Sequence, residues 1–143
     1  MRIRVYYEDT DSGGVVYHSN YLNFMERART EWLRNLGINQ YNLKLTDNMI
    51  FIVANLDIKY RKSALLDDEL QINTKLENIK ACSLLLQQEI YRDTELLTVC
   101  SIKVACVDAT KFNPLKIPSH IKKLMEPLCC LLYTSPSPRD VEE

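Results

Sequence analysis

The sequence has little histidine and lacks cysteine pairs at the spacing that metal sites require. Its two histidines, His18 and His120, lie far apart, and its five cysteines form no C-x-x-C motif. A structural zinc site therefore has no ligand set in this chain. Three of the cysteines lie within apolar strand-like runs, where a reduced thiol behaves as a small hydrophobic group, and this favours a reducing compartment: Cys82, Cys100 and Cys106.

An excess of positive charge and long apolar runs are also missing. The formal net charge of -1 and a pI near 6.1 argue against the basic surface of a nucleic-acid-binding protein. The first seven residues lack the apolar core of a signal peptide, and no run approaches the roughly 20 apolar residues of a membrane span. We therefore expect no nucleic-acid partner, no integral membrane segment and a cytoplasmic location.

The length and apolar content indicate one domain. A chain of 143 residues with 46% hydrophobic residues suits a single packed core, which we assign to residues 1–128. The remainder, 129–143, changes in character, and from Cys130 to Asp140 it resembles a translated DNA-sequencing adapter. Such a tail is non-native; the alternative interpretation is a genuine disordered tail rich in serine and proline.

One long amphipathic helix is the clearest element. A short strand over 2–8 and a turn through Gly13 and Gly14 precede it, because paired glycines permit backbone angles that other residues resist. From about Tyr17 or Ser19 to Leu36, apolar residues recur at helical spacing between charged ones: Tyr21, Met25, Ala28, Trp32 and Leu36. Ser19 or Asn20 is a candidate cap at its start, and Gly37 suits a left-handed residue at its end.

Period-two patterns dominate the rest of the chain. After a short helical stretch at 39–46, alternation places five residues on one face of a strand: Ile52, Ala54, Leu56, Ile58 and Tyr60. Similar strands are predicted at about 70–76, 82–92 and 96–108, and a short helix at 118–127. Short connections between the last four strands predict a meander-like antiparallel order. The fold class is therefore α+β, with an antiparallel sheet of about five strands wrapped around one long central helix.

Asp11 lies where a carboxylate has chemical uses. It follows the first strand, and the glycine turn leads from it to the helix N-terminus, where free backbone N–H groups favour negative charge. Such a helix end can polarise a thioester carbonyl while the carboxylate acts on water or on the carbonyl carbon. Asp9 and Asp11 are equally consistent with ordinary turn and cap residues, so spacing alone leaves the role of Asp11 open.

A family resemblance changes that weighing. From Asp11 to Leu22 the chain reads Asp-Ser-Gly-Gly-Val-Val-Tyr-His-Ser-Asn-Tyr-Leu, and from Glu26 to Glu31 it reads Glu-Arg-Ala-Arg-Thr-Glu. This strongly resembles the signature of the 4-hydroxybenzoyl-CoA thioesterase family, and above all its Tol-Pal system-associated acyl-CoA thioesterase branch. The likeness covers about residues 2–126. It implies the hotdog fold and hydrolysis of acyl-CoA to a free acid and coenzyme A without metal or organic cofactor.

The resemblance also implies site residues. Asp11 is the expected nucleophile or general base, and Tyr7 and His18 match positions that line the same site. The helix start, with Gly14 and the backbone N–H groups near Val16, Tyr17 and His18, is expected to meet the thioester carbonyl. Further expected substrate contacts lie at the end of a strand, where the cations either bind coenzyme A phosphates or simply form a basic strand end: Tyr60, Arg61 and Lys62.

Two other functions and several partners stay open at this point. The rival to the enzyme is a non-catalytic module that binds acyl-CoA or acyl carrier protein, because hotdog scaffolds bind thioesters without always cleaving them. A hotdog hydratase would need a histidine on the central helix, which holds none beyond His18. Exposed sheet edges predict a homodimer at least, and the resemblance suggests a dimer of dimers. Glu26, Arg27 and Arg29 are expected on a solvated or interface face of the helix.

Overall fold

The structure is a computed structural model, and it describes residues 1–133. It contains five strands and three α-helices, with one short 3₁₀ helix, η1 (Tyr7–Asp9). The strands are β1 (Arg2–Arg4), β2 (Met49–Tyr60), β3 (Glu69–Ile79), β4 (Ser83–Arg92) and β5 (Glu95–Asp108). The helices are α1 (His18–Asn35), α2 (Gln40–Asp47) and α3 (Ser119–Tyr133). The predicted tail beyond Tyr133 lies outside the described residues.

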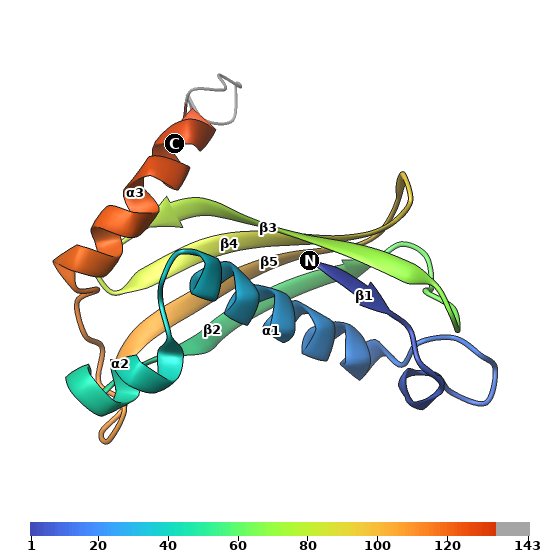
Figure 1. Ribbon diagram of the computed structural model, residues 1–143, viewed down its shortest axis with the longest axis horizontal. Helices are drawn as coiled ribbons and strands as arrows, with labels where there is room; N and C mark the ends of the chain where they lie inside the picture. Colours follow the sequence, from blue (N-terminus) through green and yellow to red (C-terminus); the bar gives the residue numbers. More distant parts are fainter. Residues whose placement is uncertain (134–143) are drawn as a thin grey trace.

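The five strands form one antiparallel sheet that curves around α1, as Figure 1 shows. This confirms the predicted α+β hotdog architecture. Within residues 1–133, no helix is both long and apolar enough to cross a membrane.

The strand order corrects one part of the prediction. The sheet runs β1-β3-β4-β5-β2, so only β3, β4 and β5 form a meander, and β2 pairs with β5 at the far edge. The connection 61–68 therefore crosses the sheet end, and the N–H groups of Arg61 and Lys62 both donate to Leu97 O at 2.8 and 3.2 Å. Arg92 holds the same crossover through Asp68 at 2.7 Å. The alternation of residues within β2 does not reveal that its partner is β5 and not the next strand in the chain.

A β-bulge in β2 corrects the prediction that residues of its first and second halves share one face of the sheet. Between Val53 and Asn55 the register with β5 shifts by one residue. Leu56 lies opposite Ile102, whereas Ile52 lies opposite Ala105, and those two β5 residues are on opposite faces of the sheet. Ile52 and the bulged Ala54 therefore do not share the inner face with Leu56, Ile58 and Tyr60. The extra residue reverses the parity of the alternation.

The first predicted strand also ends early. It stops at Arg4, and Tyr7–Asp9 form the 3₁₀ turn η1. The cause is local: Asp9 Oδ2 accepts from the N–H of Tyr6 at 2.9 Å, and Asp9 N–H donates to Tyr6 O at 3.0 Å. A short acidic side chain that binds its own backbone competes with the sheet ladder for these groups.

Helix α1 buries the face that its periodicity predicts. Tyr21, Phe24, Met25 and Ala28 are buried against the sheet, and Gly37 follows the helix with a φ of +88°. The predicted caps are wrong, because Tyr17 is the N-cap residue and makes no side-chain cap. Asn20 instead donates from its side-chain amide to Asp9 O at 2.8 Å, which ties the helix start to the preceding turn.

Candidate active site

Asp11 lies in a tight turn that fixes one of its carboxylate oxygens. Oδ1 accepts from the N–H of Gly13 at 2.8 Å and from that of Val15 at 3.3 Å. Asp11 N–H donates to Val15 O at 2.9 Å, and Gly14 closes the turn with a φ of +80°. Across residues 1–133, Oδ2 has no hydrogen-bond partner. The half-buried carboxylate thus has one anchored oxygen and one oxygen left for chemistry.

The same geometry accounts for the glycine pair. Gly14 needs its positive φ, which is costly for any residue with a Cβ. A Cβ on Gly13 would stand 3.3 Å from Asp11 Oδ1, tighter than ordinary van der Waals contact. The sequence Asp-Ser-Gly-Gly therefore builds a turn around the carboxylate, as its spacing predicts.

The start of α1 carries a ring stack. His18 and Tyr60 lie face to face with ring centroids 4.3 Å apart and an interplanar angle of 14°. Tyr60 OH donates to His18 O at 3.2 Å, and Tyr21 meets the Tyr60 ring edge-on at 5.3 Å. Burial raises the pKa of both tyrosines, so their hydroxyls stay protonated. The structure thus brings together two of the predicted site residues, His18 and Tyr60, from elements far apart in the sequence.

The free N–H groups of the helix start agree with those expected at His18 and differ at Val16 and Tyr17. Val16 N–H donates to Ala64 O at 3.0 Å, and Tyr17 N–H donates to Asp9 O at 3.1 Å. For His18 and Ser19, by contrast, no acceptor of the backbone N–H is found in the described part of the chain. These two groups are the ones that remain to polarise a carbonyl oxygen. Ala64 belongs to the crossover 61–68, far from the glycine turn in the sequence. The residues around the turn therefore do not predict that Ala64 O accepts from the Val16 N–H.

The other predicted contacts are more dispersed. Tyr7 lies in η1 with 82% of its surface exposed, and its side chain makes no hydrogen bond or ring contact among residues 1–133. Lys62 pairs with Glu95 at 2.5 Å, and Glu95 also pairs with Arg92 at 2.7 Å. Arg61 is exposed and forms no ion pair within the same residues. Of the two predicted cations, Lys62 is therefore engaged in holding the crossover and Arg61 is not.

A buried polar link positions α1 on the sheet. Gln88, in β4, is fully buried; its Nε2 donates to Met25 O and to Thr74 Oγ1, both at 3.0 Å. Its Oε1 accepts from Arg29 at 3.0 Å. Arg29 is therefore turned toward the sheet, whereas a solvated or interface face of the helix was expected for it. The signal was present in the sequence, since Gln88 interrupts the inward series Leu84, Leu86 and Ile90.

Together these groups form an arrangement suited to acyl transfer. Within residues 1–133, a carboxylate with one oxygen anchored and one without a partner precedes a helix N-terminus whose first two N–H groups have no acceptor. The carboxylate can activate water or attack a carbonyl carbon, and the helix end can stabilise the negative charge that develops on the carbonyl oxygen.

Comparisons with known proteins show the family to which the chain belongs. Residues 5–125 match the thioesterase-like superfamily. The chain is 46% identical over 120 residues to the acyl-CoA thioesterase YbgC of Haemophilus influenzae, covering 84% of this chain and 88% of that relative. It is 42% identical over 120 residues to the acyl-CoA thioester hydrolase YbgC of Escherichia coli O6:H1, covering 83% and 89%. The DHNA-CoA thioesterase of Staphylococcus aureus has the same fold, with a TM-score of 0.88, 23% identity and coverage of 96% and 94%.

Proposed function

The chain belongs to the thioesterase-like superfamily, and from this premise we propose that it is an acyl-CoA thioesterase that uses Asp11 as its catalytic carboxylate. The activity is supported by relatives at 46% and 42% identity that bear the names acyl-CoA thioesterase and acyl-CoA thioester hydrolase. The observation that supports the role of Asp11 is its anchored Oδ1 and an Oδ2 that has no hydrogen-bond partner among residues 1–133, in the turn that leads to α1.

Two routes use the same geometry. In the first, Asp11 Oδ2 takes a proton from water as the water oxygen bonds to the thioester carbon. In the second, Oδ2 bonds to that carbon itself, and water then hydrolyses the resulting anhydride. In both, the N–H groups of His18 and Ser19 donate to the carbonyl oxygen, and coenzyme A leaves as a thiolate that takes up a proton.

The His18–Tyr60 stack supports the site from the side. Tyr60 OH donates to the backbone carbonyl of His18, so β2 holds the first residue of the helix in place. The exposed His18 ring stacks on Tyr60 at the start of α1, where it can orient water. Gly14 and Tyr17 shape the turn, and Arg61 is the cation left to meet coenzyme A phosphates.

A second copy of the chain is the proposed partner. β2 is an edge strand of 12 residues, and Ile52 and Val53 on it are 37% and 44% exposed. A long apolar edge left open invites pairing with another strand, and a homodimer satisfies it with closed symmetry. The dimer of dimers, the acyl-carrier-protein partner, the cytoplasmic location and the Tol-Pal association stay predictions from the family resemblance.

Thiol release from a panel of acyl-CoA esters tests the function. Asp11→Asn keeps the size of the side chain and an oxygen for the Gly13 N–H. We expect it to lower kcat by about 10²–10⁴, the usual contribution of general acid–base catalysis. Asp9→Asn is the matched control, because it makes the same change in the same loop, and its kcat should stay within about threefold.

Two results would contradict the proposal. Full activity of Asp11→Asn removes Asp11 from the mechanism and leaves the thioesterase assignment intact. Binding of acyl-CoA without hydrolysis across the whole panel favours the rival function, a module that binds acyl-CoA or acyl carrier protein.

A further inference from the structure

The turn that holds Asp11 is bound to the crossover 61–68, and both segments lie at the same end of the sheet in Figure 1. Three consecutive residues of the crossover face three consecutive residues of the turn: Ala64, Leu65 and Leu66 face Val16, Val15 and Gly14. Leu66 N–H donates to Gly14 O at 3.2 Å, and Val16 N–H donates to Ala64 O at 3.0 Å. Between these bonds, Val15 and Leu65 form an antiparallel bridge.

Val15 couples this pairing to the carboxylate of Asp11. The N–H of Val15 donates to Asp11 Oδ1 at 3.3 Å, and Val15 O accepts from the Asp11 N–H at 2.9 Å. Val15 is therefore bonded to Asp11 and also bridged to Leu65. Because one residue makes both connections, a displacement of the crossover also displaces Asp11.

The hydroxyl of Tyr21 holds the crossover from inside the core. Tyr21 lies on α1, one helical turn after its start, and its hydroxyl oxygen accepts from the N–H of Ala64 at 2.9 Å. Both residues are buried, with 1% and 0% of their surfaces exposed. Ala64 is thus held at two atoms, since its N–H donates to Tyr21 and its C=O accepts from Val16.

Asp68 holds the same segment from its outer side. Its Oδ2 accepts from the N–H of Leu65 at 2.8 Å and from Arg92 at 2.7 Å. Arg92 also donates to Ser63 O at 3.3 Å. The crossover therefore has one buried anchor, Tyr21, and one partly exposed anchor, Asp68.

The buried anchor is the more difficult one to replace. If the hydroxyl of Tyr21 is removed, the N–H of Ala64 loses its acceptor at a position that water does not reach. A buried donor without an acceptor is costly, so the backbone around Ala64 shifts toward another acceptor. Leu65, by contrast, is exposed, and water can replace Asp68 as the acceptor of its N–H.

We propose that Tyr21 is a positioning residue for hydrolysis: its hydroxyl holds Ala64 in place, and the pairing of the crossover with the turn thereby fixes Asp11. This inference rests on the proposed function and extends it to a residue outside the glycine turn. Tyr21 is too deeply buried to meet a substrate, so it acts through Asp11. A displacement of about 1 Å in a reacting group can lower a rate by about 10².

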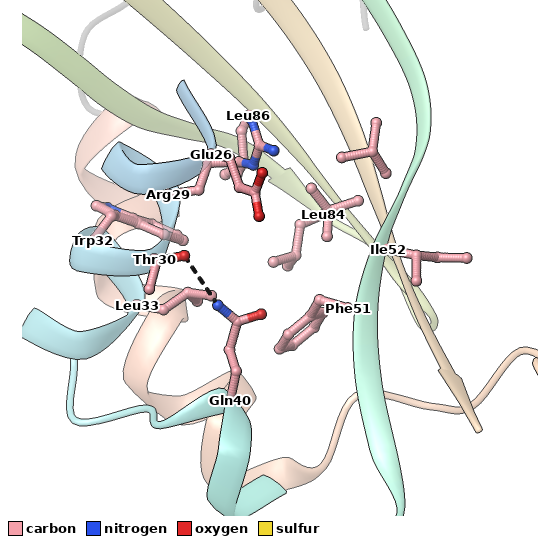
Figure 2. A pocket seen from close by; sticks show the side chains of 12 residues that line it. Glu26, Arg29, Thr30, Trp32, Leu33, Gln40, Phe51, Ile52, Leu84 and Leu86 are labelled. Carbon is pink, nitrogen blue, oxygen red and sulfur yellow. Dashed lines mark hydrogen bonds between the residues drawn. The ribbon is translucent and has the colours of Figure 1, made fainter. Parts of the chain in front are cut away.

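Tyr21→Phe removes the hydroxyl and keeps the ring. The ring meets Phe24 and Tyr60 edge-on, and these contacts do not need the hydroxyl. The variant also preserves the lining of the cavity of about 310 Å³ between α1, α2 and the sheet, whose first lining residue on α1 is Glu26 (Figure 2). We expect kcat for thioester hydrolysis to fall about 10–100-fold and KM to stay within about threefold.

Two control variants separate positioning from loss of stability. Tyr91→Phe makes the same chemical change on β4, where the hydroxyl donates to Glu89 at 3.3 Å. Ile102→Val removes one methylene group from a fully buried side chain of β5, and so it lowers the stability of the core without touching the crossover. For both controls, kcat should stay within about threefold of the wild type.

A double variant tests whether Tyr21 acts through Asp11. In the Asp11→Asn background, the further change Tyr21→Phe should alter kcat by less than about threefold, because the carboxylate that Tyr21 positions is already absent. If Tyr21 supported the enzyme only by general stability, the two losses in kcat would multiply instead.

Hydrogen exchange of the Val16 N–H measures the same pairing without turnover. This N–H donates to Ala64 O, so Tyr21→Phe should accelerate its exchange by about tenfold, and Tyr91→Phe should leave it unchanged. Asp68→Ala gives a second measurement if Tyr21→Phe does not fold, because it removes the partly exposed anchor. It should accelerate Val16 exchange by about threefold or more, whereas Glu69→Ala, which removes the neighbouring carboxylate, should not.

Three results would overturn the inference. The first is an unchanged kcat in a folded Tyr21→Phe, and the second is a loss in kcat that multiplies with that of Asp11→Asn. The third is unchanged Val16 exchange in Tyr21→Phe, or in Asp68→Ala if Tyr21→Phe does not fold. Accelerated exchange in a protein that releases no thiol from any ester would instead overturn the proposed function and leave the link between Tyr21 and the turn intact.

Discussion

Replacing Gln88 with leucine removes the polar link between α1 and the centre of the sheet. The variant loses the bond from Arg29 and the two bonds that Gln88 donates to Met25 O and Thr74 Oγ1. A hydrogen bond to a charged group is worth about 1.5–3 kcal/mol and a neutral one about 1 kcal/mol. Burial of the leucine side chain stabilises the folded state by about 1.5 kcal/mol. The net loss in the free energy of unfolding is therefore about 2–3 kcal/mol.

Urea unfolding measures this loss, and Gln87→Leu is its control. With m-values of about 1–3 kcal/mol/M, Gln88→Leu should lower the midpoint by about 0.7–3 M. Gln87 is the preceding residue on β4, lies on the other face of the sheet and makes no side-chain hydrogen bond among residues 1–133. Its change should stay within about 0.5 kcal/mol. If Gln88→Leu is as stable as Gln87→Leu, the buried network does not hold α1 to the sheet.

Two further predictions follow from the turn and the crossover. Gly14→Ala and Gly37→Ala each force a residue with a Cβ to positive φ, so each should cost about 1–2 kcal/mol in urea unfolding, but only Gly14→Ala should also lower kcat. Lys62 and Arg92 hold the pKa of Glu95 below its ordinary value of 4.5, so the stability that Glu95 contributes is present above that pH and is lost as the pH falls through the lowered pKa. The unfolding midpoint of Glu95→Gln should therefore change less than that of the wild type as pH is lowered; equal slopes would refute this.

Local patterns predicted the elements that depend on local interactions. The periodicity of Tyr21, Met25 and Ala28 defined the buried face of α1, and Gly37 marked its end because a left-handed residue is needed there. The glycine pair after Asp11 predicted the turn for the same reason. In each case the residues that determine the geometry are neighbours in the chain.

The features that the sequence did not reveal depend on distant residues. The edge position of β2 results from its pairing with β5. The bulge at Ala54 reverses the alternation of faces, although the sequence of β2 by itself looks regularly alternating. The N–H groups of Val16 and Tyr17 donate to Ala64 O and Asp9 O. Of the three expected donors, only the N–H of His18 therefore has no acceptor among residues 1–133, and that of Ser19 joins it. Arg29 was expected on an outer helix face, and Gln88, 59 positions later, turns it inward.

The strand order also determines how long β2 lacks its partner while the chain is synthesised on the ribosome. β2 is made before its one partner in the sheet, and Met49 pairs with Asp108, the last residue of β5. At about 5–20 residues per second, β2 waits several seconds after emerging before that partner exists. During this interval the apolar segment from Met49 to Val53 has no strand to pair with. A nascent chain that stalls before β5 therefore presents this segment to chaperones or to other unfolded chains.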